Sequence, residues 1–439
     1  MIGARGDGLS VTIVNCPPDH NKGACAIASG LIERLQASER VSRIAILSFF
    51  RHTSPEIDFR HLAARYPNVV IEHSPILNRG EPLRFKNRRI HGLKGRFGAS
   101  LLYTPYITGA TLGLHSQLFR ERLFRRERGA RLLLDSDLVL DRGGPFFAAH
   151  GPPPNPTLLA VSWPFMLARA TQIPYAVMGE SVGPLANFWA RHLTKSLLEQ
   201  ARLIGVREEL SREALIDAGI SPARITTTLD NAFWVKPRRS DRVDQLLREH
   251  DLADRGFLAV TCRPWPDTPR YIPELAGTLD LLVPSRFERA ALVANMYDPR
   301  GAPYVDDRAA TRLLYDQVSR KDRVSVIAED LAPDELASVY GAASVVLGTR
   351  LHSVILGLVG GAPVVAVSYS GPKTRGVMRL LGLSDYVLDI ETFDRRAASE
   401  LADAAAARRQ AAGATIERLR TNGDALLDEL LGQIAEERR

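Results

Sequence analysis

Three charged side chains in the last third of the chain have the types and spacing needed for acid–base chemistry on a small anion. Arg350 and His352 follow a strand expected at 344–347, and Lys373 follows the next one, at 364–368. Two fixed cations lower the pKa of a nearby imidazole, which suits proton transfer near neutrality. The cations and the amides at the starts of the following helices would together bind a dianion. The alternative is structural, with His352 beginning a helix and Lys373 in a solvated loop.

The elements that must position these side chains alternate between short apolar runs and helix-length segments. The strands expected in the first half are 11–16, 42–48, 69–72, 132–140, 175–178 and 203–207, and those in the second half are 257–262, 290–295, 324–328, 344–347, 364–368 and 386–389. Helices are expected between them, including 25–36 and 333–342. The fold class predicted is α/β, with two doubly wound Rossmann-like domains facing a cleft and a C-terminal helical tail.

The length of 439 residues favours two substantial domains. We expect an N-terminal Rossmann-like domain over 1–242, a C-terminal one over 243–392, and helices over 393–439. The Pro-, Arg- and Lys-rich stretch 237–242 is the expected linker. Ligands of open parallel sheets bind outside the carboxyl ends of the strands, so the chemistry is expected at strand-to-helix turns.

The composition excludes several classes of protein. Apolar residues at 45% and charged residues at 24% argue against a disordered or fibrous chain. Three cysteines without a CxxC pair indicate neither a disulfide framework nor a zinc site. The beginning of the chain lacks the pattern of a signal peptide, and no uncharged run is a smooth span of about 20 residues. We therefore expect a cytoplasmic protein that binds no metal.

The net charge of +7 comes from one segment. Residues 79–131 contain 13 basic and three acidic residues, a local charge of +10, and the rest of the chain carries −3. Within it, 116–128 (SQLFRERLFRRER) mixes Leu and Phe with arginines, as a helix on the inner face of a membrane would. The alternative is a solvated helix whose apolar stripe packs in the core. No nucleic-acid-binding module accompanies the charge, so nucleic acid is not an expected partner.

Motifs along most of the chain resemble those of the polysaccharide pyruvyl transferase family. The Arg350-Leu351-His352 element and the Tyr369-x-x-x-Lys373 turn, which closes on 380–383 (LLGL), are similar to the family signature. The other pieces that resemble family elements, in order, are the turn at 179–184 (GESVGP), the strand end at 204–211 (IGVREELS), Asp230-Asn231-Ala232-Phe233 and Asp334-Glu335-Leu336.

The resemblance implies a fold of the glycosyltransferase B type and phosphoenolpyruvate as the donor. The product would be a pyruvate ketal on a sugar of a cell-surface polysaccharide or its lipid-linked precursor. The family pattern implies Arg207, His352 and Lys373 as catalytic residues, with His352 acting as acid and then as base. The donor carries a phosphate and a carboxylate, which require at least two cations. Donor binding is accordingly expected from Arg207, Arg350, Lys373 and Ser353, although Arg350 could instead pair structurally with an acid.

Five residues are candidates for contacting the acceptor or shaping its loops: Asn21, Gly23, Gly143, Gly144 and Glu180. Asn21 and Gly23 match an N-x-G-D element of the family, but Ala24 stands where the family has Asp. Another acid, such as Asp19, would have to take its place, unless Asn21 and Gly23 only shape a turn. The two adjacent glycines either bring backbone amides to a ligand or form a simple turn.

Two other functions stay open from the sequence. The first is a nucleotide-sugar-dependent glycosyltransferase of the same architecture. The second is a non-catalytic binding member of a polysaccharide assembly complex, which the replacement at Ala24 would suit. The expected partners are phosphoenolpyruvate, a saccharide acceptor and the inner face of the membrane, with no bound cofactor.

Overall fold

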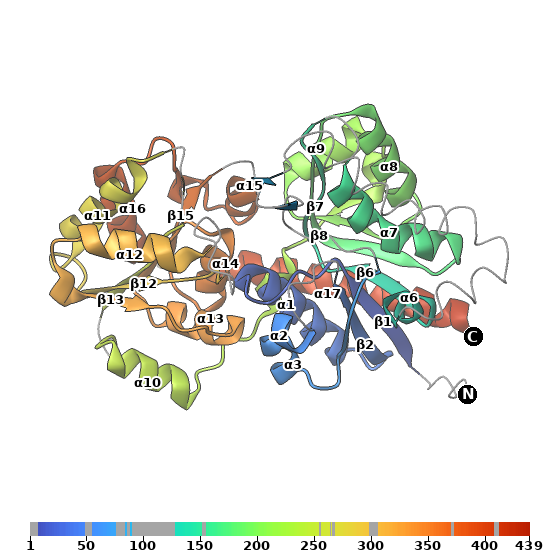
Figure 1. Cartoon of the computed structure of the whole chain (residues 1–439), viewed down its shortest axis with the longest axis horizontal. Helices are drawn as coiled ribbons and strands as arrows, with labels where there is room; N and C mark the ends of the chain where they lie inside the picture. Colours follow the sequence, from blue (N-terminus) through green and yellow to red (C-terminus); the bar gives the residue numbers. More distant parts are fainter. Residues whose placement is uncertain are drawn as a thin grey trace. The chain divides into compact units, whose positions relative to one another are not determined.

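The computed structural model describes residues 8–48, 55–75, 84–85, 88–89, 128–151, 155–253, 256–263, 265, 268–297, 306–369, 373–407 and 412–439. They form two compact units, each built on its own sheet (Figure 1). The first unit takes the described parts of Met1–Asp19, Leu31–Asn231 and Thr421–Arg439, and the second those of His20–Gly30 and Ala232–Arg420. The units divide between Asn231 and Ala232 and also within two helices, α1 (Lys22–Ala37) and α17 (Ala412–Arg438). The domain boundary expected at residue 242 stays a prediction.

The first unit contains an eight-stranded sheet in which every described pairing is parallel. Its order is β10-β9-β8-β6-β1-β2-β3, with β7 paired to β8. The strands are β1 (Leu9–Val14), β2 (Val41–Ser48), β3 (Val70–His73), β6 (Leu138–Asp141), β7 (Gly144–Ala149), β8 (Tyr175–Leu185), β9 (Ile204–Val206) and β10 (Ile225–Thr227). Their nearly continuous apolar runs fit strands that are covered on both faces.

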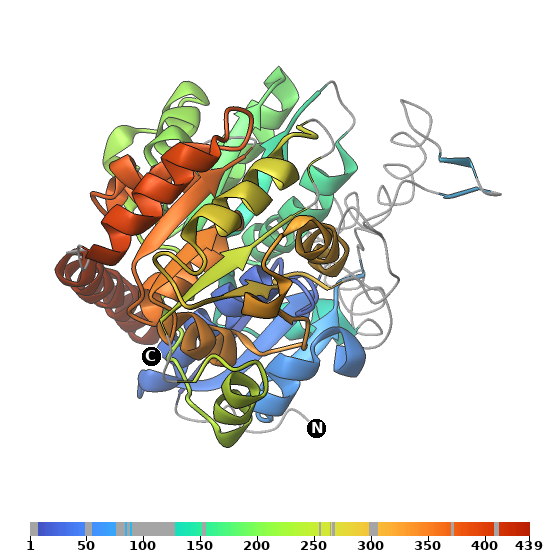
Figure 2. The same ribbon diagram turned by 90° about the vertical axis from the view of Figure 1, so that its left-hand side faces the viewer.

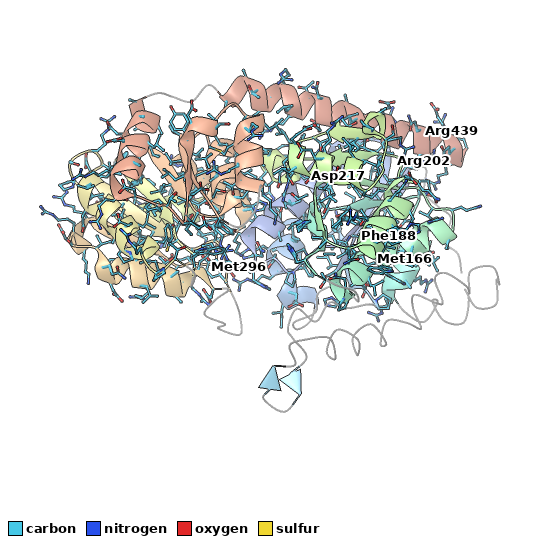
Figure 3. The ribbon with its side chains drawn as sticks, turned by 90° about the horizontal axis from the view of Figure 1, so that it is seen from above. Met166, Phe188, Arg202, Asp217, Met296 and Arg439 are labelled. Carbon is cyan, nitrogen blue, oxygen red and sulfur yellow. The ribbon has the colours of Figure 1, made fainter. Side chains whose placement is uncertain are left out.

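Helices α6, α7 and α8 of the first unit cover one face of this sheet. Their apolar residues share a core with Val14, Val139 and Val177. The helices are α2 (Pro55–Asp58), α3 (Arg60–Arg65), α6 (Arg128–Leu134), α7 (Pro156–Ala170), α8 (Phe188–Leu198) and α9 (Glu209–Asp217), together with the later part of α1 (Lys22–Ala37) and the end of α17 (Ala412–Arg438). Arg202 donates to Glu437 at 2.8 Å and ties down the last turn of α17, and Figure 3 shows Arg202 beside the chain end at Arg439.

The second unit contains a six-stranded sheet, again parallel throughout. The order is β13-β12-β11-β14-β15-β16, the 3-2-1-4-5-6 order of a doubly wound fold. The strands are β11 (Phe257–Thr261), β12 (Arg289–Val293), β13 (Val324–Ile327), β14 (Val345–Gly348), β15 (Val364–Ser368) and β16 (Val387–Asp389). Figure 2 shows these strands, coloured yellow-green to orange, running between layers of helices.

Helices of the second unit cover both faces of its sheet. Leu258 and Val260 of β11 pack in a core with α11, α12 and α16, whereas Gly357 of α14 lies against Val346 and Val364 on the other face. The helices are α10 (Asp241–Glu249), α11 (Tyr271–Leu282), α12 (Asp307–Gln317), α13 (Pro333–Gly341), α14 (Leu351–Val359), α15 (Lys373–Leu380) and α16 (Arg395–Ala407).

The predicted fold class is confirmed as α/β with two parallel sheets and C-terminal helices. Two local predictions were wrong. The strand expected at 132–140 begins only at Leu138, because 132–134 form the end of α6, where Leu132 and Leu133 are buried at adjacent helical positions. The turn expected at 179–184 lies inside β8, where Gly179 and Gly183 have positive φ angles of 71° and 95° within a continuous strand.

The basic segment 79–131 lies mostly outside the described residues. Its described parts are a short antiparallel pair, β4 (Arg84–Phe85) with β5 (Arg88–Arg89), and the start of α6. The helix expected at 116–128 is outside them apart from residue 128. No helix in the described part of the chain is long and apolar enough to span a membrane.

Candidate active site

Most of the predicted site residues lie at the carboxyl edge of the second sheet. Strands β11 and β14 are neighbours at its centre, and the helices that follow them, α11 and α14, cover opposite faces. Ligands of doubly wound sheets bind at this switch point. Arg350 and His352 follow β14 directly, and Lys373 is the first residue of α15, which follows β15.

The imidazole of His352 packs against the first turn of α1. A Cβ atom on Gly23 would lie 2.5 Å from Cγ of His352 and closer still to its Nδ1, so any side chain at this position would require the imidazole to move. Two motifs that are far apart in sequence, the one at Asn21–Gly23 and the one at Arg350–His352, are therefore brought together in the second unit.

Backbone pairing holds the beginning of α1 beside His352. Asn21 and Met296 form an isolated antiparallel bridge, flanked by hydrogen bonds from Lys22 N to Asn295 O at 3.2 Å and from Tyr297 N to His20 O at 3.1 Å. Met296 is labelled in Figure 3. The Asn21 side chain accepts a hydrogen bond from Ala24 N at 3.2 Å, which caps the helix. This geometry favours the structural alternative for Asn21, with Gly23 packed on the histidine.

Lys22 adds a buried charge to this turn. Its side chain is fully buried, forms an ion pair with Asp330 and places Nζ 5.3 Å from the centroid of the Tyr297 ring. A buried ammonium is stable only when it is paired, so these contacts fix the register of α1 in the second unit.

Asp19, the acid suggested in place of the family's Asp at position 24, makes hydrogen bonds within the first unit. The Asp19 carboxylate accepts hydrogen bonds from His61 N at 2.6 Å and from Leu62 N at 3.2 Å, and it is buried in the first unit. These bonds satisfy the first amides of α3. Asp19 therefore supports the fold of the first unit, and its geometry gives no sign of an acceptor-orienting role.

Arg350 forms a bidentate ion pair with Asp307. Its Nε lies 3.2 Å from both carboxylate oxygens of Asp307, and its terminal nitrogen is also bonded to Oδ1. Burial alone would lower the pKa of Arg350, but the carboxylate outweighs burial and holds that pKa above its ordinary value. Asp306 caps α12 by accepting from Arg308 N at 2.9 Å, which places Asp307 in the first turn. Arg350 is thus permanently charged and held rigidly.

Ser353, expected to bind the donor, is fully buried behind this edge. Its hydroxyl donates to Arg350 O at 2.7 Å and lies 3.0 Å from Thr261 Oγ1. Thr349 N donates to the same Thr261 oxygen at 2.9 Å. These hydroxyl contacts join the ends of β11 and β14, so Ser353 contributes to the framework under Arg350.

One cation at this edge was missed in the sequence analysis. Arg263 follows Cys262 after the end of β11, and its Cζ lies 3.9 Å from the ring centroid of Tyr369 and 5.0 Å from that of Trp265. Tyr369 also helps to hold the pKa of Arg350 above its ordinary value, after the larger effect of Asp307. The signal that could have found Arg263 is its place directly after a predicted strand.

Arg207 lies in the first unit, in a buried network of charges. It forms an ion pair with Asp230, lies 3.4 Å from a Glu208 oxygen, and donates from Nε to Ser181 Oγ at 2.7 Å. Burial alone would lower the pKa of Arg207, but Asp230 and then Glu208 outweigh it and raise that pKa above its ordinary value. The Arg207 side chain is only 1% exposed, which indicates a structural function for its charge.

Glu180 belongs to the same buried network. Its side chain is fully buried in β8, and its charge acts on both Arg142 and Arg207. Gly143 has a φ of 90°, and a Cβ there would lie 2.6 Å from Met178 O, so the glycine allows close approach to β8. Gly144 has a φ of 128° and begins β7. The geometry of the two glycines favours the simple turn.

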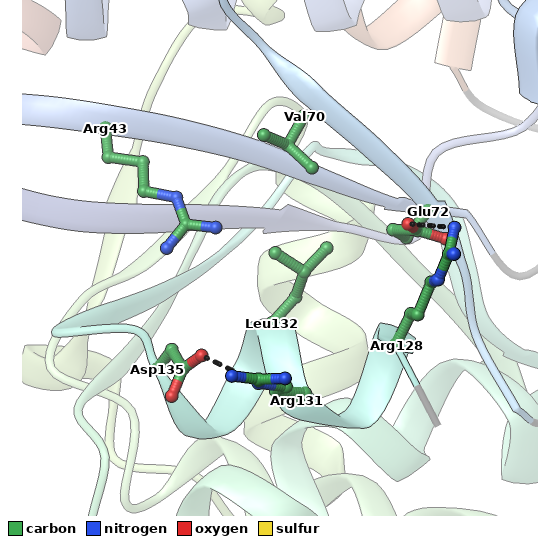
Figure 4. Close-up of a pocket in the computed structure, with 7 residues that line it drawn as sticks. All are labelled: Arg43, Val70, Glu72, Arg128, Arg131, Leu132 and Asp135. Carbon is green, nitrogen blue, oxygen red and sulfur yellow. Dashed lines mark ion pairs between the residues drawn. The ribbon is translucent and has the colours of Figure 1, made fainter. Parts of the chain in front are cut away.

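A separate pocket of about 310 Å³ lies on the first unit between strands β2 and β3 and helix α6 (Figure 4). It is lined by Arg43, Val70, Glu72, Arg128, Arg131, Leu132 and Asp135. Ion pairs of 3.7 Å join Arg128 to Glu72 and Arg131 to Asp135, so two of its three arginines are already matched by acids. Among the described residues, no group of three or more His, Cys, Asp or Glu side chains is placed to hold a metal ion.

Comparison with known proteins identifies the family. A model of the polysaccharide pyruvyl transferase family matches residues 43–371, about three quarters of the chain. The chain belongs to this family. The matched residues include Arg350 and His352, while Asn21 and Gly23 lie before the match and Lys373 lies after it.

The chain is 27% identical over 266 residues to the amylovoran biosynthesis protein AmsJ of Erwinia amylovora. The match spans 58% of this chain and 62% of that protein. Two solved structures share the fold. Anabaena HepE in complex with UDP-glucose has a TM-score of 0.54 at 12% sequence identity, and the match covers 96% of this chain and 100% of that one. A glycosyltransferase from Rickettsia africae has a TM-score of 0.55 at 10% identity, and the match covers 97% of this chain and 98% of that one. UDP-GlcNAc 2-epimerase from Neisseria meningitidis is also similar, with a TM-score of 0.53 at 12% identity over 97% of this chain and 99% of that one. The chain is therefore built on the glycosyltransferase B type of fold.

Proposed function

We propose that this protein transfers a pyruvyl group from phosphoenolpyruvate to two hydroxyls of one sugar, forming a ketal and releasing phosphate. The acceptor is a cell-surface polysaccharide or its lipid-linked precursor. The observation that carries the proposal is the position of His352, packed on Gly23 beside the fixed cation Arg350 at the switch point of the second sheet. Membership of the family supports the reaction class.

His352 supplies the proton transfers in this proposal. It protonates C3 of the enol, which leaves a cationic C2 stabilised by the phosphate ester oxygen. The first sugar hydroxyl adds to C2 and returns a proton to the imidazole. Cleavage of the C2–O bond then releases phosphate and restores the cation, and the second hydroxyl closes the ketal. One hydroxyl proton thus ends on C3 and the other on phosphate, so one imidazole acts as acid and base.

Fixed cations bind the donor and stabilise the departing phosphate. Arg350 is suited to this task because Asp307 holds its guanidinium in place, so little reorganisation is needed when the donor binds. Lys373, at the first turn of α15, is proposed as a further anchor. Arg207 and Ser353, both buried and bonded within the fold, are assigned supporting functions in their own units.

The test is restoration of ketal-linked pyruvate in cells that lack the protein. Surface polysaccharide is isolated from deletion cells that carry the wild-type gene, His352→Asn or His192→Asn, and analysed by mass spectrometry and by the methyl signal in NMR. His192 is exposed on α8 in the first unit and serves as the matched control. We expect the wild type and His192→Asn to restore the ketal, and His352→Asn to abolish it.

Donor specificity separates the proposal from a nucleotide-sugar glycosyltransferase. We expect phosphoenolpyruvate, and not UDP-glucose, to raise the thermal unfolding temperature of the purified protein. The reverse result would favour the glycosyltransferase. Full restoration of the ketal by His352→Asn would instead favour a non-catalytic role, because the protein would then act without its proton donor.

A further inference from the structure

The pocket on the first unit carries charges that the family motifs do not explain. It lies beside β3, the last strand in the described order of the first sheet, and is closed by β2 and α6. Its volume of about 310 Å³ is in the range of small-ligand sites. Figure 4 shows Leu132 pointing from α6 toward the strands, with Arg43 at one end of the pocket and the Arg128–Glu72 ion pair at the other. The lining is therefore both apolar and charged.

Arg43 supplies a positive charge that no acid of the pocket matches. It lies on β2 and is exposed, and in the described part of the chain its side chain forms no ion pair or hydrogen bond. The other two arginines of the lining, Arg128 and Arg131, are paired with Glu72 and Asp135. Three arginines thus face two acids, and the lining has a net charge of +1. A ligand group with one negative charge would neutralise it.

The two ion pairs leave their arginines available to a ligand. The charged atoms are 3.7 Å apart in both pairs, which is longer than a hydrogen bond. The side chains of Arg128 and Arg131 are 85% and 67% exposed, so water screens both pairs and they contribute little to stability. Either guanidinium can therefore turn toward an incoming oxyanion, to which arginine binds through two N–H groups.

Aliphatic side chains give the pocket its second property. Val70 is 38% exposed at the start of β3, and Leu132 of α6 lines the same pocket. None of the described lining residues is aromatic, so the pocket offers no surface on which a nucleotide base could stack. A phosphate that is attached to an aliphatic group fits this lining better than a nucleotide does.

The surrounding sequence indicates where such a phosphate comes from. Arg128 and Arg131 are the last two basic residues of 79–131, and Arg128 also ends 116–128, the stretch expected to lie on a membrane surface. Basic residues near a membrane attract its anionic lipids. We propose that the pocket of the first unit binds the phosphate of an anionic phospholipid, with Arg43 as its main contact. This site goes beyond the proposed function and does not depend on pyruvyl transfer.

The experiment measures binding of the purified full chain to vesicles of phosphatidylcholine with or without an equal share of phosphatidylglycerol. We expect Arg43→Gln to weaken binding to the anionic vesicles by about tenfold, because a charge-assisted hydrogen bond to the phosphate is lost. Arg43→Lys should recover part of the affinity, since lysine keeps the charge but not the planar fork.

Arg40→Gln is the matched control for charge. Arg40 is also exposed and precedes Arg43 closely in the sequence, but it does not line the pocket. Its replacement removes the same charge from the same region of the first unit. We expect a loss of about twofold or less, since a cation without a bound phosphate acts only through screened attraction.

Val70→Trp tests the pocket without changing any charge. Val70 is exposed on a strand, where an aromatic side chain is tolerated, and the indole would fill the space that the head group needs. We expect a loss of about tenfold, as for removal of the arginine contact. Leu210→Trp, at an exposed position of α9 outside the pocket, should not weaken binding. Thermal unfolding shows that each variant is folded.

The outcomes decide the lipid site separately from catalysis. Equal losses in Arg43→Gln and Arg40→Gln, wild-type affinity in Val70→Trp, or a wild-type protein that ignores anionic vesicles would each overturn it. Binding of inorganic phosphate at Arg43, with vesicle binding that does not depend on Arg43, would assign the pocket to a soluble anion and also overturn it. Vesicle binding that depends on Arg43 and Val70 would support the site even in a protein that transfers no pyruvyl group.

Discussion

Gly23 and His352 are in such close contact that the histidine leaves no room for a side chain on the glycine. A Cβ atom there would lie 2.5 Å from Cγ of the imidazole. The contact places the start of α1 against the proposed acid–base group, so the helix sterically limits the positions that the imidazole ring can adopt.

Replacing Gly23 with alanine should displace the imidazole and lower kcat by about 100-fold, since misplacing a catalytic group by ~1 Å has an effect of that size. Steady-state phosphate release is the measurement, together with thermal unfolding to show that the variant is folded. Gly413→Ala is the control: a Cβ at Gly413 in α17 meets no atom within 4 Å, so activity should be unchanged. Wild-type kcat in Gly23→Ala would mean that the ring position is unimportant.

Replacing Asp307 with asparagine should destabilise the second unit by ~3 kcal/mol, because it leaves the partly buried Arg350 guanidinium without its fully buried carboxylate partner. Calorimetric unfolding of the full chain measures the loss. The neighbouring change Asp306→Asn removes a charge from an N-cap and should cost ~1 kcal/mol or less. Equal losses in the two variants would show that the ion pair contributes nothing beyond the cap.

Asp141 should make the first unit more stable at mildly acidic pH. Burial raises the pKa of this carboxyl to about 6, despite hydrogen bonds from Gly143 N and Asn15 and the charge of Arg142. The folded state thus holds the proton more tightly than the unfolded one, whose pKa is 3.8. Stability from this group is present below pH 3.8 and lost as pH rises through 6, a change of at most ~3 kcal/mol.

The measurement for Asp141 is urea unfolding between about pH 4 and pH 7, a range that spans the interval between the pKa values of the unfolded and folded states. Asp141→Asn should flatten the pH dependence relative to the wild type. The exposed Asp217→Asn in α9 should leave it unchanged. A wild-type curve with the same slope as that of Asp141→Asn would show that the carboxyl is ionised in both states.

Arg207 should affect stability more than donor affinity. Asp230→Asn removes a carboxylate from a buried guanidinium and should destabilise the first unit by ~3 kcal/mol or more. Arg207→Lys should lower the unfolding temperature while changing KM for phosphoenolpyruvate less than threefold (about 0.7 kcal/mol). A large rise in KM with an unchanged unfolding temperature would instead return Arg207 to the donor site.

The basic segment 79–131 stays a prediction for membrane contact. Replacing Arg120, Arg122, Arg125 and Arg126 with Gln should reduce co-sedimentation with phosphatidylglycerol vesicles, at about 1 kcal/mol per well-placed cation. Neutral phosphatidylcholine vesicles are the control for binding that does not depend on charge. Unchanged sedimentation with anionic vesicles would favour the alternative of a solvated helix.

The strands of the fold could be predicted because their signals are local. Apolar runs bounded by turn residues located β15 at both ends, and the alternation with helices gave the fold class. The same kind of signal gave a wrong prediction of a strand at 132–134, because three consecutive leucines fit a buried helix as well as a strand.

The candidate site could be predicted only in part, because its geometry depends on long-range pairing. His352 and Arg350 stood out by type and by place after a strand. Arg263 gained its meaning from the pairing of β11 with β14, which no local pattern reveals. The burial of Asp307 and Arg207 could not be predicted either, since the sequence does not show which partner will neutralise a charged side chain in the fold.

The bridge between Asn21 and Met296 and the contact between Gly23 and His352 also set an order of events during synthesis. Roughly 330 residues separate Gly23 from His352, and at ~5–20 residues per second about 20–60 s pass between their addition. The first turn of α1 can therefore form these contacts only after Met296 and His352 have been added to the chain. A chain that terminates before residue 352 lacks the histidine against which Gly23 packs.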